Sequence, residues 1–281
     1  MIRRVWQVPR HGRGGQGTLV PMSARGRRRV PLRRLGFWYG MAACILKPLT
    51  WAFMKRDWRG MEHVPPTGGV ILAANHISHA DPIVLADYVV YGTGRIARFL
   101  AKSTLFKRRS FVGAIMRGAG QIPVYRHTAD ASLALQDAVD ALHNGECIAI
   151  YPEGTVSRDP AKWPMLAKTG VARLALLSGV PVVPVAQWGA EEILDSYRTK
   201  GLHLLPRHTM HIVAGPPVDL AKYAGKELTA DVLRGATDEI MRAVTALLED
   251  LRGEKAPSGF FDARDILAAG RAAKSKERTS A

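Results

Sequence analysis

The chain has 281 residues, of which 47% are hydrophobic and 7% aromatic, which is enough apolar material for the core of one large domain. The two cysteines, Cys44 and Cys147, lie in apolar sequence without metal-ligand spacing, which argues against a disulfide framework and fits a reducing compartment. The net charge of +16 is concentrated in residues 1–34, where ten arginines and no acidic residue contribute +10. The basicity therefore belongs to a tail, and the rest of the chain is nearly balanced.

A basic tail has two natural partners, nucleic acid or an anionic membrane. Residues 36–54 follow it and are apolar apart from Thr50 and the Lys47-Pro48 pair. As a helix this segment would extend about 28 Å, against about 30 Å for the hydrocarbon core of a bilayer. Because Lys47 and Pro48 interrupt it, we expect a helix or helix pair lying in the membrane interface. A true span and a buried core helix remain alternatives.

A signal peptide would also combine a basic start with an apolar run. Here the run begins late, and residues 55–59 (Lys-Arg-Asp-Trp-Arg) follow it instead of a small-residue cleavage site. Met22 is an alternative start to Met1, since residues 1–21 look like no part of a fold. We therefore expect a protein at the cytoplasmic face of the cell membrane, peripheral or interfacially anchored, whose partner is an anionic membrane surface and not nucleic acid.

From Val64 onward, short apolar runs alternate with helical periodicity, which is typical of an α/β domain. Extended segments are expected at 69–74, 97–101, 121–125, 146–151, 180–186 and 209–214. Helices are expected at 82–90, 129–143, 165–177 and 232–251. Because prolines remove ladder donors, the strand at 180–186 should be irregular or lie at a sheet edge.

The predicted architecture is a single mixed-sheet α/β domain with an N-terminal membrane-interfacial helical element. Its segments are a basic tail expected to be disordered (1–35), an apolar membrane-interacting element (36–58), the α/β domain (59–251) and a charged flexible C-terminal tail (252–281).

His76 and Asp81 come just after the first predicted buried strand of this domain. In open α/β sheets, ligands gather at the carboxyl ends of strands. An imidazole held by a carboxylate can act as a base for a hydroxyl nucleophile. Asp81 could instead cap the helix that Pro82 opens, with His76 an ordinary loop residue, and the pair alone does not decide between these.

Three further segments lie in or at the ends of predicted strands, and each carries side chains that could contact a substrate. Residues 120–126 end in Arg126, and residues 151–158 read Tyr-Pro-Glu-Gly-Thr-Val-Ser-Arg. Residues 180–185 (Val-Pro-Val-Val-Pro-Val) supply an apolar, proline-stiffened wall.

With Asn-His-x-Ser-x-x-Asp at 75–81, these segments stand in the order and rough spacing of the glycerophospholipid acyltransferase family. That family includes the 1-acyl-glycerol-3-phosphate acyltransferases. The resemblance runs from about Arg59 to Val218, over half of the chain, and four motifs in order are more specific than any one of them.

The resemblance implies catalytic roles for His76, similar to the family's general base, and for Asp81, similar to its orienting carboxylate. Substrate contacts are expected from Asn75, Ser78, Lys102, Arg126, Glu153, Gly154, Thr155, Ser157, Arg158, Pro181 and Pro184. Of these, Lys102, Arg126 and 153–155 match positions associated with the acceptor's glycerol phosphate. The two prolines match a motif linked to the acyl donor. The resemblance implies no cofactor and no metal, with acyl-CoA or acyl carrier protein as co-substrate and a lysophospholipid as acceptor.

One departure concerns the acceptor. The family usually has arginine after Glu-Gly-Thr, where this chain has Val156. An arginine could grip phosphate with its fork of donors, and valine cannot. Arg158 is one possible substitute; otherwise the phosphate belongs to a larger headgroup, as in another lysophospholipid, or the acceptor is a lipid-linked sugar.

The chain has no Gly-x-Ser-x-Gly elbow and no cysteine in an activating context, so the acceptor hydroxyl is expected to attack the thioester directly. Two histidine pairs, His76 with His79 and His208 with His211, lack the further ligands of a metal site. Glu191-Glu192 is interpreted as a solvated helix face. Lys107-Arg108-Arg109 is either ordinary surface charge or a lipid-headgroup contact.

A basic nucleic-acid-binding protein is the alternative from a different functional class. Against it, the charge is confined to one tail without interleaved aromatics for base stacking.

Overall fold

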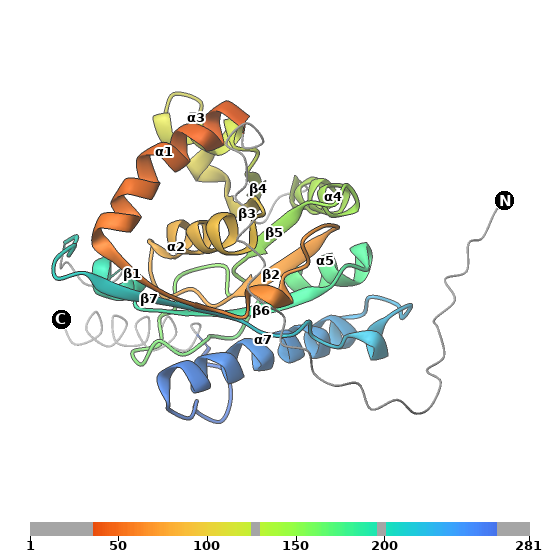
Figure 1. The fold of residues 1–281 in the computed structure, drawn as a ribbon. Coiled ribbons are helices and arrows are strands. Elements are labelled where there is room, and N and C mark those ends of the chain that lie inside the picture. The colour runs from red at the N-terminus through yellow and green to blue at the C-terminus, as the bar shows by residue number, and fades with distance from the viewer. Residues whose placement is uncertain (1–35, 125–129, 196–200, 263–281) are drawn as a thin grey trace, which may run out of the picture.

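The computed structural model describes residues 36–124, 130–195 and 201–262, which form a mixed α/β fold around one sheet (Figure 1). The seven strands lie in the order β1-β7-β6-β2-β5-β3-β4. They are β1 (Met54–Arg59), β2 (Val70–Ala74), β3 (Ala97–Lys102), β4 (Ile122–Val124), β5 (Cys147–Ile150), β6 (Val182–Trp188) and β7 (His208–Ala214). Only the β6–β7 pair is antiparallel among these strands, so the single mixed sheet predicted from the sequence is confirmed.

Helices cover both faces of the sheet (Figure 1). They are α1 (Gly36–Phe53), α2 (Asp81–Asp87), α3 (Phe111–Gly118), α4 (Asp130–His143), α5 (Gly170–Ser178), α6 (Ala190–Ile193) and α7 (Ala230–Arg252). A π-helical turn continues α2 over Tyr88–Thr93, and short 3-10 turns lie at Met61–His63, Ser103–Phe106 and Ala221–Tyr223. The predicted strands and helices are thus present, with shifts at their ends.

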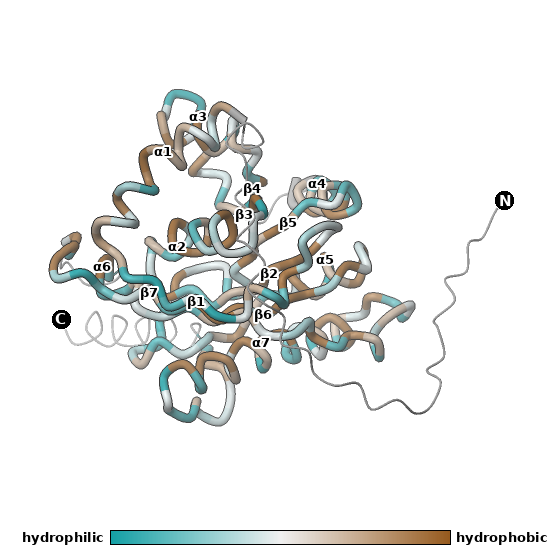
Figure 2. The backbone as a smooth tube through the Cα atoms, in the orientation of Figure 1, coloured by the Kyte–Doolittle hydropathy of each residue, from teal (hydrophilic) through white to brown (hydrophobic). Residues whose placement is uncertain are grey.

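β2 is the central strand of the core, and its five residues are all fully buried. Val70, Leu72 and Ala74 join the apolar cluster under α2, whereas Ile71 and Ala73 join the cluster formed with α4, α5 and α7. A strand covered on both faces needs a continuous apolar run, because successive side chains point to opposite sides. Figure 2 shows this hydrophobic centre, and it also shows hydrophobic residues along α1 at the outside of the fold.

β6 lies inside the sheet, between β2 and β7, so the expectation of an edge strand is wrong. Pro184 pairs with Ala73 of β2, and its carbonyl accepts a hydrogen bond of 2.9 Å from Gly215 N just beyond the end of β7. Pro184 therefore lacks its N–H at the position where the antiparallel hydrogen bonding between β6 and β7 ends. An interior strand tolerates proline at such a position because only one terminal bond is lost.

Two element boundaries differ from the predictions by about five residues, more than the others do. The helix expected from Met165 begins only at Gly170, because the preceding amides serve other segments: Met165 N donates to Glu153 and Lys168 N donates to Pro152 O. Residues 54–58, expected within the helical element, form most of β1, which pairs in parallel with β7. The sheet thus begins directly after α1.

The C-terminal region contacts the body of the fold as far as it is described. Phe261 pairs with Met165 in an isolated bridge, and its carbonyl accepts from Leu166 N. At the end of α7, the Arg252 guanidinium lies between the rings of Trp163 and Trp188, 4.0 and 4.4 Å from their centroids. The predictions for the tails at 1–35 and beyond residue 262 lie outside the described residues.

α1 runs as one helix through Pro48. Within the described ranges, the structure contains no helix with the length and apolarity needed to cross a bilayer.

The solvated position expected for Glu191 is wrong, since this residue of α6 is only 7% exposed. Its Oε2 accepts from Gly189 N at 2.9 Å. Burial raises the pKa of Glu191 from 4.5 to about 7, and the nearby charge of Asp81 adds to the rise. The sequence pattern missed this because Glu191 follows a turn at Gly189 that directs it inward, whereas Glu192 is exposed.

We predict that Glu191 makes stability depend on pH. Because its folded pKa of about 7 exceeds the ordinary 4.5, the stability that it contributes is complete below about pH 4.5 and is lost as pH rises through about 7. Glu191→Gln is always neutral, so the unfolding free energy of wild type relative to this variant should fall by up to about 3 kcal/mol between about pH 5 and pH 8. Urea denaturation of both proteins checks this, and parallel pH curves would contradict it.

Candidate active site

The candidate site lies where parallel strands β2, β5 and β3 end side by side. His76 follows β2, Gly154 follows β5, and Lys102 is the last residue of β3. Because parallel strands present their carboxyl ends at one edge of the sheet, three segments far apart in sequence meet there.

Asp81 holds His76 from the first residue of α2. Its Oδ2 accepts from His76 Nδ1 at 2.8 Å and from the backbone N–H groups of Ile77 at 2.6 Å and Ser78 at 2.8 Å. With the ring hydrogen on Nδ1, Nε2 keeps its lone pair. The Asp81 side chain is 0% exposed and that of His76 14%. Asp81 is not the helix cap, since that position is Ala80, so its carboxylate is used for the histidine loop.

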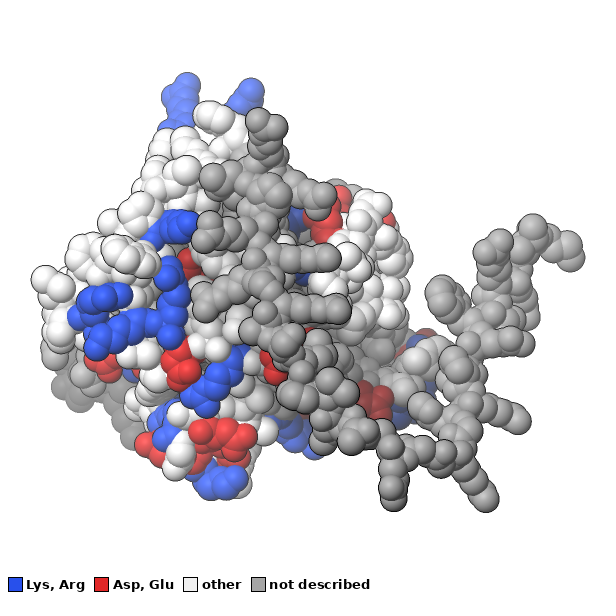
Figure 3. All heavy atoms as spheres, viewed as in Figure 1, with Lys and Arg blue, Asp and Glu red and all other residues white. Residues whose placement is uncertain are grey.

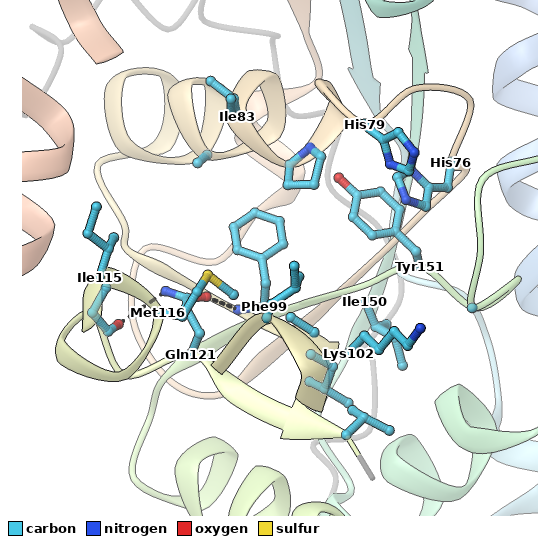
Figure 4. A pocket seen from close by; sticks show the side chains of 18 of the residues that line it. His76, His79, Ile83, Phe99, Lys102, Ile115, Met116, Gln121, Ile150 and Tyr151 are labelled. Atoms are coloured by element: carbon cyan, nitrogen blue, oxygen red, sulfur yellow. Dashed lines mark hydrogen bonds between the residues drawn. The ribbon is translucent and has the colours of Figure 1, made fainter. Parts of the chain in front are cut away.

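Tyr151 forms the floor beneath the imidazole. Its ring stacks on that of His76 with centroids 4.2 Å apart and planes inclined by 20°. Burial raises the pKa of Tyr151 well above its ordinary value, so the ring stays neutral. The stacking, which Figure 4 shows, and the Asp81 bond together fix both the plane and the direction of the imidazole.

Asn75 ties the histidine loop to β6. Its side chain donates to Gln187 O at 3.0 Å and accepts from Gln187 N at 2.8 Å, while its carbonyl accepts from Gln187 Nε2 at 2.7 Å. Three bonds thus continue the β2–β6 pairing by one residue past Ala74. This explains why an amide side chain directly precedes the histidine.

Glu153 ties the same loop to the segment before α5. Its Oε1 accepts from His76 N at 3.0 Å and its Oε2 from Met165 N at 2.9 Å. Burial raises the pKa of Glu153 to about 8, although these two backbone bonds oppose the rise. Ser157 adds a further tie, because its N–H donates to His76 O at 2.6 Å.

A cavity of about 970 Å³ opens from this site. Figure 4 shows His76 and Tyr151 at one side of it, with Phe99, Met116 and Ile115 lying toward the opposite side. Most of its lining is apolar, and α1, α2, α3 and β3 all contribute to it. A volume of this size suits a ligand with a long apolar part and a few polar contacts.

The structure separates the predicted site residues into two groups. His76, Lys102, Gly154 and Thr155 line the cavity. The others that are described lie outside its wall: Asn75, Ser78, Asp81, Glu153, Ser157, Arg158, Pro181 and Pro184. Ser78 holds the loop from behind, through Oγ to Leu194 O at 2.6 Å. Pro181 is exposed, and Pro184 is buried inside the sheet. Arg126 lies outside the described residues.

Four residues at the site were not predicted from the sequence: Tyr151, Gln187, Lys168 and Arg173. Tyr151 could have been noticed, since it directly precedes the Pro-Glu-Gly-Thr segment. Gln187, Lys168 and Arg173 carry no motif. Only the fold brings Gln187 to Asn75 and places Lys168 and Arg173 in the lining of the cavity that His76 also lines.

Comparison with known proteins agrees with this geometry. The sequence model of the acyltransferase family matches residues 55–188. The chain is 27% identical over 210 residues to the 1-acyl-sn-glycerol-3-phosphate acyltransferase of Borreliella burgdorferi, covering 74% of this chain and 78% of that protein. The chain belongs to the glycerophospholipid acyltransferase family. It is an acyltransferase enzyme.

Other members of the family are similar over much of the chain. The chloroplastic 1-acyl-sn-glycerol-3-phosphate acyltransferase BAT2 of Brassica napus is 26% identical over 196 residues, and the match covers 69% of this chain and 53% of that protein. The crystal structure of the 1-acyl-sn-glycerophosphate acyltransferase PlsC from Thermotoga maritima shares the fold, with a TM-score of 0.55 and 24% identity. That match covers 78% of this chain and 82% of PlsC.

We predict that Glu153 positions the catalytic loop of this acyltransferase. In Glu153→Gln, one of the two backbone N–H groups would face an amide NH2, so kcat should fall by about 10-fold or more and the melting temperature should drop. Steady-state kinetics and thermal denaturation measure both, with Glu192→Gln as the exposed control. A variant with normal kcat and a raised acceptor KM would show instead that the carboxylate contacts the acceptor.

Proposed function

We propose that this acyltransferase moves a fatty acyl group from acyl-CoA, or acyl carrier protein, to the free hydroxyl of 1-acyl-glycerol-3-phosphate, giving phosphatidate. The observation that carries the proposal is the bond between His76 and Asp81 beside a largely apolar cavity that His76 lines. The printed activity of the Borreliella and Brassica relatives supports the same acceptor. The reaction needs no cofactor beyond the acyl-carrying co-substrate.

The proposed mechanism is a direct transfer with His76 as general base. The acceptor hydroxyl gives its proton to Nε2 as its oxygen attacks the thioester carbonyl carbon, forming a C–O bond. Collapse of the tetrahedral intermediate breaks the C–S bond, and the departing thiolate takes the proton from His76. Asp81 stabilises the imidazolium between these steps through the 2.8 Å bond to Nδ1.

The apolar part of the cavity is suited to the acyl chain of the donor. Its walls include Leu46 of α1, Ile83 of α2, Phe99 of β3 and Ile115 of α3. Transfer of methylene groups from water to such a surface is favourable by about 0.8 kcal/mol each, so a long chain would bind tightly. The thioester would then lie near His76 at the polar end.

Val156 favours a second class of acceptor as the alternative substrate. It is 3% exposed and lines the cavity where the family usually has arginine. A different lysophospholipid or a lipid-linked sugar would undergo the same chemistry, because the mechanism needs only a free hydroxyl near His76.

We predict that an acceptor panel will identify lysophosphatidate as the preferred acceptor. Purified protein is incubated with labelled palmitoyl-CoA and lysophosphatidate, other lysophospholipids or a lipid-linked sugar, and products are separated. His76→Ala should reduce kcat by about 10²-fold or more with an unchanged melting temperature, since general-base catalysis is typically worth 10²–10⁴-fold. Transfer to another acceptor but none to lysophosphatidate would refute the proposed substrate; near-normal turnover by the variant would refute the role of His76.

A membrane-facing surface fits a lipid substrate. Phe37 of α1 and Phe111 of α3 are 75% and 64% exposed, and Trp51 and Val112 are also exposed. The loop between β3 and α3 adds the exposed cations at 107–109. Figure 3 shows Lys and Arg side chains projecting at the top of the view, where α1 and α3 meet. Apolar side chains beside cations favour the interface of an anionic membrane, so we propose peripheral attachment at the cytoplasmic face.

We predict that Phe37 and Phe111 contribute to vesicle binding. The double variant Phe37→Ser with Phe111→Ser should bind vesicles of phosphatidylglycerol and phosphatidylethanolamine about 10-fold or more weakly, because two exposed rings no longer enter the interface. Cosedimentation measures binding. Leu177→Ser on α5 is the control, since Leu177 is similarly apolar and 47% exposed. Equal loss in the control, or none in the double variant, would contradict this surface.

A further inference from the structure

Arg252, at the C-terminal end of α7, lies beyond the part of the chain that the family model matches. Its side chain is only 10% exposed. The guanidinium lies over the rings of Trp163 and Trp188, 4.0 and 4.4 Å from their centroids. It also donates through Nη1 to Ala161 O at 2.8 Å and through Nη2 to Glu254 Oε2 at 2.6 Å. Two rings and two oxygens thus fix its position.

Trp163 belongs to residues 157–166, a segment that binds the backbone of His76. The carbonyl of Trp163 accepts from Ser157 Oγ at 2.8 Å. Ser157 N in turn donates to His76 O at 2.6 Å. Two hydrogen bonds therefore connect the first ring that Arg252 contacts to the peptide carbonyl of His76.

Trp188 belongs to a second support of the same loop. It is the last residue of β6 and directly follows Gln187, whose three hydrogen bonds hold Asn75. Asn75 immediately precedes His76. The guanidinium of Arg252 therefore joins two segments that are distant in sequence and that each bind the His76 loop.

The chain that follows α7 supports residues 157–166 as well. Phe261 pairs with Met165 in an isolated bridge, and its carbonyl accepts from Leu166 N at 2.9 Å. Met165 N donates to one oxygen of Glu153, and the other oxygen accepts from His76 N. The N–H and the C=O of His76 are thus both bound by residues that the C-terminal part of the chain holds in place.

Stability alone does not require a cation between the two rings. Burying a charge costs free energy, and a well-packed apolar side chain of similar volume often gives equal or greater stability. What arginine adds is direction, because its donors form a rigid fork and its charge is attracted to the faces of aromatic rings. We therefore interpret Arg252 as fixing how Trp163 and Trp188 lie relative to each other.

We infer that Arg252 is a positioning residue of this acyltransferase: through Trp163 and Trp188 it holds the loop that carries His76 in the orientation needed for transfer. The inference rests on the proposed function in that His76 is the base. Arg252 is outside the wall of the cavity, so it acts on the loop and not on a substrate. Its removal should therefore lower kcat and leave substrate binding nearly unchanged.

The test uses the full chain with Arg252→Met, which keeps an unbranched side chain between the rings but removes the charge and the donors. With palmitoyl-CoA and lysophosphatidate, kcat should fall by about 10-fold while the KM for each stays within about 2-fold. Arg252→Lys, which keeps the cation, should recover most of kcat. Arg242→Met is the control, since Arg242 is on the same helix and its side chain is 66% exposed.

A double-mutant cycle tests the route from Arg252 to His76. Ser157→Ala removes the hydroxyl that binds Trp163 O and keeps the N–H that binds His76 O. Arg252→Met should then lower kcat by a smaller factor in the Ser157→Ala background than in wild type, because one of the two supports is already disconnected. Equal factors in both backgrounds, or a normal kcat in Arg252→Met, would overturn the inference.

Hydrogen exchange measured by mass spectrometry separates this inference from the proposed function, because it needs no acceptor. In Arg252→Met, the amides of residues 75–81 should exchange about 10-fold faster than in wild type, whereas those of 97–102 in β3 should keep the wild-type rate. If the loop responds in this way but wild type transfers nothing to lysophosphatidate, the positioning role stands and the proposed acceptor falls.

Transfer by wild type, with unchanged exchange at 75–81 in the variant, would overturn the positioning role and leave the proposed function intact. Equally faster exchange at 75–81 and 97–102 would also overturn it, because Arg252 would then support the whole fold and not the loop. Melting temperatures show whether each variant is folded. Arg252→Gln, which keeps donors without the charge, replaces Arg252→Met in every measurement if the methionine variant is unfolded.

Discussion

The arrangement of the His76 loop depends on one carboxylate oxygen. Oδ2 of Asp81 accepts three hydrogen bonds, from the imidazole of His76 and from the backbone of the two residues that follow it. The same atom therefore sets the course of the loop and the orientation of the ring on that loop. Asp81 is the first residue of α2 and is fully buried. The position of this helix therefore fixes the position of the His76 ring directly, through one hydrogen bond.

The remaining ties all act on the same short loop. Gln187 from β6 holds Asn75, Glu153 from the end of β5 holds the amide of His76, and Tyr151 supports its ring. These three residues lie in or just after the two strands adjacent to β2. A base on a surface loop would lose orientation through thermal motion, and ties to neighbouring strands give the loop the rigidity of the sheet.

The cavity combines two chemistries that a glycerolipid acyltransferase needs to bring together. Its lining includes apolar residues of α1, α2 and α3, the basic side chains of Lys102, Lys168 and Arg173, and the imidazole of His76. The exposed surface of α1 and α3 adjoins the apolar end. In the proposed function, acyl chains would enter from the membrane side, and the phosphate would remain at the polar mouth.

Much of the fold was accessible from local sequence. The apolar run at 70–74 predicted β2, and the spacing of apolar residues predicted α7. Both predictions use only the local pattern of hydrophobic residues, which does not depend on the rest of the fold. The position of β6 could not be predicted from the sequence, because a proline such as Pro184 usually indicates an edge strand. It is tolerated inside this sheet because the pairing of β6 with β7 ends at Val185 and Ala214. The start of α5 at Gly170 could not be predicted either, since the backbone N–H groups before it donate hydrogen bonds to Glu153 and Pro152.

For the site, the sequence by itself predicted the pairing of His76 with Asp81 and identified the family, because these residues and the Glu-Gly-Thr turn stand at short, specific spacings. Only the tertiary structure decided which of the predicted residues line the cavity. Asn75, Ser78 and Glu153 use their side chains to hold the loop, whereas Lys168 and Arg173, without any motif, reach the cavity. The physical reason is that a side chain's partners depend on the strand order and on the end of α5, which bring together residues that are distant in sequence.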